Sequence, residues 1–264
     1  MLSRLALRIA AIEALAPSDA VELGLPMPTI AGNRVYDSRQ SPIDSAADIE
    51  GKPIVIVYTE AQDFKPYPSG STRADDTHVT LIIELMIASR GIVTIGLPDG
   101  TTQDVGTLDT PMMEGPQEAL LDLLEAMVRR RLDTRADASP EGLRFRNIAA
   151  GFKSIESVPA RDDSRTVRMA ARTLSFQAKI PMDRWPDATL SPVTVTGLDA
   201  LPEPLRSLAK SLPASSPHLA TCQAIASAIA DPADLTPLQQ IGITADINRS
   251  SPQTPPDITG IVTF

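Results

Sequence analysis

The sequence is poor in the residue types that build covalent cross-links and metal centres. It contains one cysteine, Cys222, and two histidines, His78 and His218. A single thiol excludes an intramolecular disulfide and a cysteine-based zinc knuckle. His218 and Cys222 are four residues apart and would share one helical face, but two ligands do not complete a tetrahedral zinc site. We therefore expect no metal centre and no cofactor.

Long apolar runs and basic patches are also scarce. No stretch reaches the roughly 20 apolar residues that a transmembrane helix needs, so we expect no contact with a membrane. Arg8 and Glu13 interrupt the apolar start of the chain, which favours a cytosolic helix over a signal peptide. The net charge is −9, whereas a protein that wraps nucleic acid needs a cationic face. DNA is expected only as a passing contact.

Signatures of catalysis are missing. The sequence has no Gly-x-x-x-x-Gly-Lys-Ser/Thr loop, no Gly-x-Gly-x-x-Gly turn after a strand and no Gly-x-Ser-x-Gly elbow. The acidic pairs Asp75-Asp76 and Asp162-Asp163 lie in polar segments, where neighbouring side chains point to different sides and do not form an acid/base couple. We expect a protein that is not an enzyme. The alternative is a metal-dependent hydrolase that uses Asp75, Asp76 and His78.

The periodicity of apolar residues predicts an α+β fold. Two segments have helical spacing, and four have the alternation or the β-branched run of a strand. The helices are expected at 3–15 and 116–132, and the strands at 34–37, 53–58, 78–89 and 174–180. In the second helix the predicted buried stripe is Leu120, Leu121, Leu124, Met127 and Val128. This order of elements indicates a mainly antiparallel sheet with helices packed on one face.

Turn residues and polar stretches separate these elements. Pro98-Asp99-Gly100 predicts the turn of a projecting β-hairpin between residues 92–95 and 101–105. Residues 16–33 and the polar stretch Glu60–Asp76 are expected as loops. A third helix is expected from Ser139 to about Phe152.

Proline density changes along the chain. Twelve of the 24 prolines lie in the last 84 residues. We therefore divide the chain into a domain of residues 1–180 and a Pro-rich extension of residues 181–264. Within the extension we expect short helices at 201–212 and 218–230, and an extended tail from Asn248 onward.

One part of the sequence resembles a known family. The segment Ala31-Gly32-Asn33-Arg34-Val35-Tyr36-Asp37-Ser38-Arg39-Gln40-Ser41-Pro42 precedes the strand Lys52-Pro53-Ile54-Val55-Ile56-Val57-Tyr58-Thr59. Together with the helix that contains Leu-Arg-Ile-Ala-Ala-Ile, these segments resemble the tail-terminator proteins of long-tailed bacteriophages. The resemblance covers about Leu2 to Ile180.

The resemblance implies a structural protein of the virion tail or neck, assembled in the host cytoplasm. Proteins of this family form a ring, commonly hexameric, that caps the tail tube, ends its polymerisation and offers a docking surface to the head connector. The implied partners are copies of the chain itself, the tail-tube protein, the head–tail connector or neck protein, and the sheath where the tail is contractile. A neck or head-completion adaptor on a similar fold is the alternative.

Ring assembly needs surfaces that find partners in neighbouring subunits. We expect open strand edges on the long strand 78–89 and on the hairpin 97–107, unless the extension covers them within one chain. The Glu60–Asp76 loop and the arginines at the end of the second helix are further contact regions, although cations there also suit the carbonyl end of the helix. The candidate interface residues are Arg34, Tyr36, Arg39, Gln62, Asp63, Lys65, Asp99, Arg129, Arg130 and Arg131.

Overall fold

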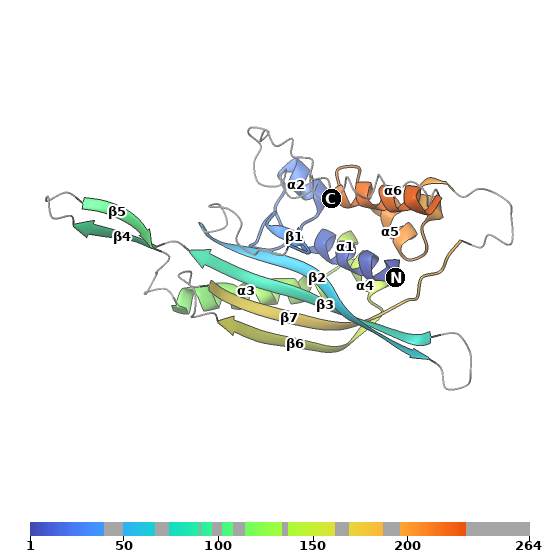
Figure 1. Cartoon of the computed structure of the whole chain (residues 1–264), viewed down its shortest axis with the longest axis horizontal. Helices are drawn as coiled ribbons and strands as arrows, with labels where there is room; N and C mark the ends of the chain where they lie inside the picture. The colour runs from blue at the N-terminus through green and yellow to red at the C-terminus, as the bar shows by residue number, and fades with distance from the viewer. Residues whose placement is uncertain are drawn as a thin grey trace, which may run out of the picture.

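The computed structural model shows an α+β fold in which helices cover one face of a mixed, mostly antiparallel sheet (Figure 1). The predicted fold class is confirmed at this level. The structure describes residues 1–39, 50–66, 74–89, 91–96, 102–107, 114–133, 137–161, 169–186 and 196–230.

The main sheet has five strands in the order β1-β2-β3-β7-β6. β1 runs parallel to β2, and every other neighbouring pair is antiparallel. The strands predicted at 34–37, 53–58, 78–89 and 174–180 are confirmed, with different ends. The strands are β1 (Val35–Asp37), β2 (Glu50–Pro66), β3 (Ala74–Ser89), β7 (Met169–Ile180) and β6 (Gly151–Arg161).

β3 lies at the centre of the sheet because it is apolar on both faces. Its odd-numbered residues from Val79 to Ile87 belong to the core under the helices. Ile82 and Met86 are buried on the opposite face. Hydrogen bonding to β2 on one side and β7 on the other leaves β3 without an edge in this sheet. The expectation that the long strand exposes an edge is therefore wrong, and the outermost strands are β1 and β6.

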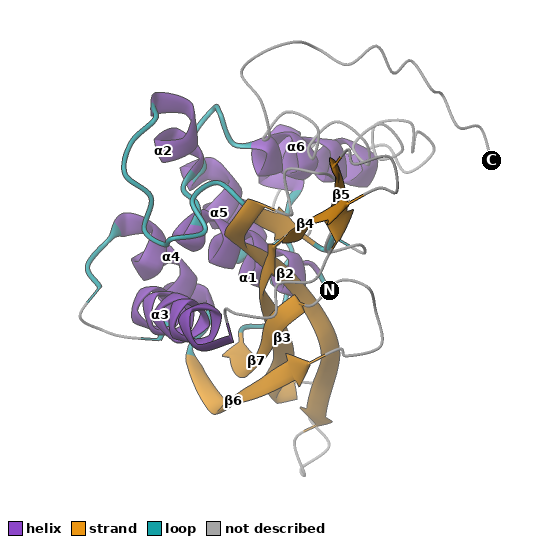
Figure 2. Ribbon diagram, turned by 90° about the vertical axis from the view of Figure 1, so that its left-hand side faces the viewer, coloured by secondary structure: helices purple, strands orange, loops and turns teal. Residues whose placement is uncertain are grey.

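α1 (Leu2–Leu15) lies in the middle of the molecule, and Figure 2 shows it between the strands of the sheet and the helices α4 and α5. Ten of its 14 residues are buried, so it lacks the solvent-facing side of an ordinary amphipathic helix. Alanines at positions 6, 10, 11 and 14 let neighbouring elements approach it on several sides. The helix predicted at residues 3–15 is confirmed.

The other helices form a layer around α1. Seven hydrophobic residues of the extension, among them Leu201, Leu205, Leu208 and Cys222, share one cluster with α1. The helices predicted at 116–132 and 218–230 are confirmed, the helix predicted at 201–212 is shorter and covers Leu205–Ser211, and the tail from Asn248 lies outside the described residues. The helices are α2 (Ser18–Leu23), α3 (Glu114–Leu132), α4 (Pro140–Ile148), η2 (Gly197–Ala200), α5 (Leu205–Ser211) and α6 (Pro217–Ala230).

Two segments predicted as loops contain regular structure. Ser18–Leu23 forms α2. Residues 60–66 and 74–76 continue β2 and β3, with Asp63 opposite His78 in the antiparallel register. The side-chain pattern of these residues alone predicts a loop. Hydrogen bonds between the two strands satisfy their backbone polar groups and make them part of the sheet.

Two further predictions, the end of the third helix and the burial of Leu120, are also wrong. The third helix ends at Ile148, and β6 begins at Gly151. Phe152 belongs to the sheet because its ring packs between Phe145 and Phe176, with centroid distances of 6.2 and 5.4 Å. Leu120 is 39% exposed, because the buried side of α3 is formed by Leu121, Leu124, Val128 and Leu132.

β4 (Gly91–Gly96) and β5 (Thr102–Thr107) pair with each other as a separate antiparallel sheet of two strands. Their register runs from Gly91 opposite Thr107 to Gly96 opposite Thr102. The turn that holds Asp99 lies outside the described residues. That the hairpin projects and overlaps a neighbouring subunit stays a prediction.

Candidate assembly surface

Tyr36 and Arg39 stack on each other at the end of β1. Tyr36 lies on the sheet face that points away from the helices, where it packs against a small buried cluster. The guanidinium carbon of Arg39 is 4.4 Å from the centre of the Tyr36 ring, which is the geometry of a cation–π contact. The structure thus joins two of the predicted interface residues. The cluster beneath Tyr36 consists of Ile54, Ile56 and Met86.

Side chains tie β1 to α1 and to β2. Arg8 of α1 forms an ion pair with Asp37, with 2.6 Å between Nε and Oδ1. Arg34 donates a hydrogen bond of 3.0 Å from Nη1 to the carbonyl oxygen of Lys52. These contacts hold the end of β1 in one position, and with it the Tyr36–Arg39 stack.

A second polar contact lies on the same outer face of the sheet. Tyr58 Oη donates a hydrogen bond of 2.7 Å to Glu84 Oε1. Burial, followed by the hydrogen bond to Glu84 and its negative charge, raises the pKa of Tyr58 well above its usual range. The Tyr58 phenol therefore stays neutral over the whole physiological range of pH.

Gln62, Asp63 and Lys65 lie on the part of β2 that extends past β1. Asp63 is exposed, and Lys65 pairs with β3 through its backbone while its side chain is outside the described part. β1 pairs only with Val55–Val57. Among the described residues, the outer edge of β2 from Tyr58 onward therefore has no strand partner.

The three arginines at the end of α3 have three different environments. Arg129 forms an i,i+4 ion pair of 2.9 Å within α3, and Arg130 is exposed. Arg131 donates from Nε to the carbonyl oxygen of Ala14 at 2.9 Å and pairs with Asp137 at 3.0 Å. Arg131 therefore joins the end of α3 to the end of α1, and Arg130 is the member of the cluster that faces solvent.

Asp137 connects the Arg131 contacts to the start of α4. Its carboxylate accepts hydrogen bonds of 3.0 Å from the backbone N–H and from the hydroxyl of Ser139. Ser139 Oγ in turn accepts from the Gly142 N–H at 3.1 Å and caps α4. Burial opposes ionisation of Asp137, but the bonds from Ser139 and the charge of Arg131 outweigh it and lower the pKa of Asp137.

Arg172 of β7 carries a charge cluster that our sequence analysis missed. Its guanidinium reaches three carboxylates of α3: Asp122 at 2.6 Å, Glu125 at 2.8 Å and Glu118 at 3.2 Å. Burial opposes the charged form of Arg172, but Glu125 and Asp122 outweigh it and raise its pKa. The signal in the sequence was the spacing of the three acids by four and three residues, which places them on one side of the helix.

The edge of β6 is a second feature that the sequence analysis missed. β6 ends the sheet and has no strand partner on its outer side among the described residues. Val158 is 55% exposed there. Pro159 and a register shift between Phe152 and Ser154 interrupt the edge, and such interruptions limit uncontrolled pairing. The regular part of the edge is therefore Ser154–Val158.

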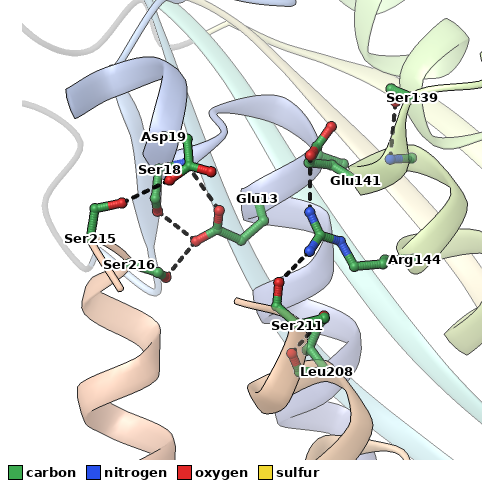
Figure 3. Close-up of polar contacts among 12 residues, drawn as sticks. Glu13, Ser18, Asp19, Ser139, Glu141, Arg144, Leu208, Ser211, Ser215 and Ser216 are labelled. Carbon is green, nitrogen blue, oxygen red and sulfur yellow. Dashed lines mark hydrogen bonds and ion pairs between the residues drawn. The ribbon is translucent and has the colours of Figure 1, made fainter. Parts of the chain in front are cut away.

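Glu13 of α1 lies at the centre of a buried polar cluster (Figure 3). Its side chain is 2% exposed. Oε1 accepts hydrogen bonds of 2.6 Å from the hydroxyls of Ser18 and Ser216, and Oε2 accepts one of 3.0 Å from the Ser18 N–H. The cluster joins α1 to the starts of α2 and α6. The sequence signal was an acidic residue inside a helix that is otherwise apolar at that end.

A pocket of about 420 Å³ opens between α4, the segment after β7, and α5. Most of its lining is apolar, and Arg144, Arg184 and Glu203 are among its polar residues. None of these residues was a predicted site residue. The apolar lining consists of Ile148, Pro181, Met182, Pro204 and Leu208.

Chemistry-bearing residues are dispersed in the described part of the chain. No group of three His, Cys, Asp or Glu side chains there could hold a metal ion. His78 is half-buried on β3, and the side chains of Asp75 and Asp76 are not among those described. Cys222 is buried in the core, and burial raises the pKa of its thiol to about 12. No helix in the described segments is long and apolar enough to cross a bilayer.

No protein-family model matches this chain, and a search of curated proteins found no match either.

Proposed function

We propose that the chain is a structural protein of the bacteriophage head–tail junction. It forms a ring on the last ring of the tail tube, ends tube growth and offers a docking surface to the head connector. The proposal starts from the resemblance of residues 2–180 to tail terminators. An α+β fold with helices on one face of the sheet is compatible with that resemblance.

The observation that carries ring assembly is that two different edges of the sheet have no strand partner among the described residues. One is Ser154–Val158 of β6, and the other is the part of β2 beyond its pairing with β1 at Val55–Val57. Unlike surfaces that meet head to tail generate a ring when the rotation closes. Exposed Lys153, next to Ser154–Val158, carries the opposite charge to exposed Glu60 and Asp63 on β2, whereas exposed Glu156 within that segment is acidic. A register that brings Lys153 to Glu60 or Asp63 is therefore favoured.

The helices of the extension, α5 and α6, also support the assignment of the β6 and β2 edges to assembly. α5 packs against α1 and η2, and α6 packs against η2 and α5, so in the described structure they add to the helical layer. Arg130 and the Tyr36–Arg39 stack are then the contacts proposed for the tail tube or the connector. The net charge of −9 suits a lumen through which DNA slides without binding, because phosphates are repelled.

The first test is the mass of the purified protein, alone and mixed with tail tubes of the same virus, measured by light scattering. A Val158→Lys variant places a charge at the β6 edge and is expected to abolish the ring on the tube. The matched control is Val158→Thr, which keeps β-branching and is expected to assemble. Equal melting temperatures of the two variants separate assembly from folding. A monomer in every mixture contradicts the proposal.

The second test distinguishes a terminator from a neck adaptor. Particles from infected cells that lack this protein are examined by negative-stain electron microscopy. Overlong tails are expected for a terminator, because nothing ends tube growth. Tails of normal length that fail to join heads would assign the protein to the neck instead.

A further inference from the structure

The pocket of about 420 Å³ between α4, residues 181–184 and α5 has the size of a ligand site. Pockets that bind small ligands or side chains measure about 300–1,000 Å³ and combine an apolar lining with a few polar groups. Ile148, Pro181 and Leu208 supply the apolar lining here, and Arg144, Arg184 and Asn147 are among the polar residues.

One wall is held by contacts that use backbone atoms. The Arg184 N–H donates to the Glu203 carbonyl at 3.0 Å, and the Glu203 N–H donates to the Arg184 carbonyl at 2.9 Å. The neighbouring Asp183 carboxylate accepts from the N–H groups of Leu2 at 2.9 Å and Ser3 at 2.7 Å, at the start of α1. These contacts fix the segment that carries Arg184 on both sides, and none of them involves the Arg184 side chain.

The opposite wall is held by Arg144 of α4. Its guanidinium donates to the Ser211 carbonyl of α5 and to Glu141 Oε1, the latter at 2.9 Å (Figure 3). Arg144 therefore joins α4 to α5 and has its charge balanced within α4. The pocket is formed before any ligand arrives, which reduces the entropic cost of binding.

Two of the polar groups that line the pocket remain available to a ligand. Arg184 is exposed, and neither its guanidinium nor the Asn147 amide makes a hydrogen bond or ion pair with a described residue. Glu203 is engaged by Arg206 at 2.8 Å and by the Ser207 N–H at 3.1 Å. The unengaged charge at the pocket is therefore positive.

We propose that this pocket binds a segment of a partner protein in which a large aliphatic side chain stands beside a carboxylate. The aliphatic side chain fills the apolar lining, and the carboxylate pairs with Arg184 next to the Asn147 amide. Met182, which lines the pocket, is 41% exposed, and Trp185, the neighbour of Arg184 in the chain, is 54% exposed, so apolar surface is available beside the pocket where a peptide chain can continue. The inference does not depend on ring formation.

Trp185 makes the test direct. It is the only tryptophan of the chain and directly follows Arg184, which lines the pocket, so we expect its intrinsic fluorescence to respond to binding there. The full-length protein is titrated with the capped peptide acetyl-Gly-Leu-Glu-Gly-amide. A saturable change in Trp185 emission is expected. The same peptide with Gln in place of Glu is expected to bind at least about fivefold more weakly, because a charge-assisted contact is lost.

Variants of the protein locate the contact. Arg184→Gln is expected to weaken the Glu peptide about tenfold, whereas the Gln peptide changes little. The backbone bonds of residue 184 remain, so the variant is expected to melt with the parent protein. Lys210→Gln is the matched control, since Lys210 is an exposed cation of α5 that pairs with Asp199 outside the pocket. It is expected to bind like the parent protein.

Four results would each overturn the inference. The first is no emission change up to millimolar peptide, and the second is equal binding of the Glu and Gln peptides. The third is N-acetylleucine binding as tightly as the peptide, which would assign the pocket to free small carboxylates. The fourth is tighter binding of a synthetic peptide of residues 255–264, which would make the chain's own segment the occupant. None of these results bears on whether the protein forms a ring.

Discussion

Glu13 and Ser216 are 203 positions apart in the sequence, yet the Ser216 hydroxyl donates a hydrogen bond of 2.6 Å to Glu13 Oε1 in the interior. A buried carboxylate is costly unless donors surround it. Ser18 supplies two more hydrogen bonds, and the Ser216 Oγ also accepts from the His218 N–H in the first turn of α6. The Glu13 charge therefore lies at the positive end of the α6 dipole and links the extension to α1.

Replacement of Glu13 by Gln tests this cluster. The Gln amide presents an NH2 group to hydroxyl and N–H donors, so at least one donor loses its acceptor. We expect Glu13→Gln to lower the free energy of unfolding by about 1–3 kcal/mol. Urea denaturation followed by circular dichroism measures the change.

Glu22→Gln is the control for the Glu13 prediction, because Glu22 is an exposed glutamate of the nearby α2. Its effect is expected to stay within about 0.5 kcal/mol. Equal stability of Glu13→Gln and the parent protein would contradict the role of the carboxylate.

The arginines at the end of α3 offer a comparison of neighbours. Arg131 holds the Ala14 carbonyl and Asp137, whereas Arg130 is exposed. We expect Arg131→Ala to cost about 2–3 kcal/mol, because a partly buried carboxylate and a helix-end carbonyl lose their donor. Arg130→Ala is expected to cost less than about 0.5 kcal/mol. Thermal unfolding of both variants measures the difference, and similar melting temperatures would refute it.

Asp137 makes stability depend on pH in the acid range. Its pKa in the folded protein is lower than its usual value of 3.8, so the unfolded chain binds the proton more readily. The stability that Asp137 contributes is complete above that usual value and is lost as the pH falls towards its folded-state pKa. We expect the urea midpoint of the parent protein to fall more steeply from pH 5 to pH 3 than that of Asp137→Asn. Parallel curves would contradict the pKa shift.

Cys222 provides a probe of the core, because it is the only thiol. Burial raises its pKa to about 12, so almost no thiolate forms in the folded protein at pH 8. We expect iodoacetamide to modify the native protein far more slowly than the protein in 8 M urea, by a factor above about 100. Mass spectrometry of the intact chain measures the rates. Rapid labelling of the native protein would place α6 outside the core.

Local patterns predicted the elements in which one residue type repeats with a regular period. The alternation from Val79 to Ile87 identified β3, and Leu121, Leu124 and Val128 identified the buried side of α3. β6 was missed because Ser154, Glu156 and Ser157 give it no alternation, and its pairing with β7 is what makes it a strand. The candidate interface was predicted in part: Tyr36 and Arg39 do lie together, whereas Arg131 is engaged inside the molecule.

The sequence by itself determined the fold class and most helices and strands, because hydrophobic periodicity is a local property of the chain. The tertiary structure decided which charges are buried, which strands end the sheet and which residues line the pocket. Glu13 is buried and Arg172 partly buried because their partners, Ser216 and the carboxylates of α3, come from distant parts of the chain. No window of sequence contains both members of such a pair, and only folding brings them together.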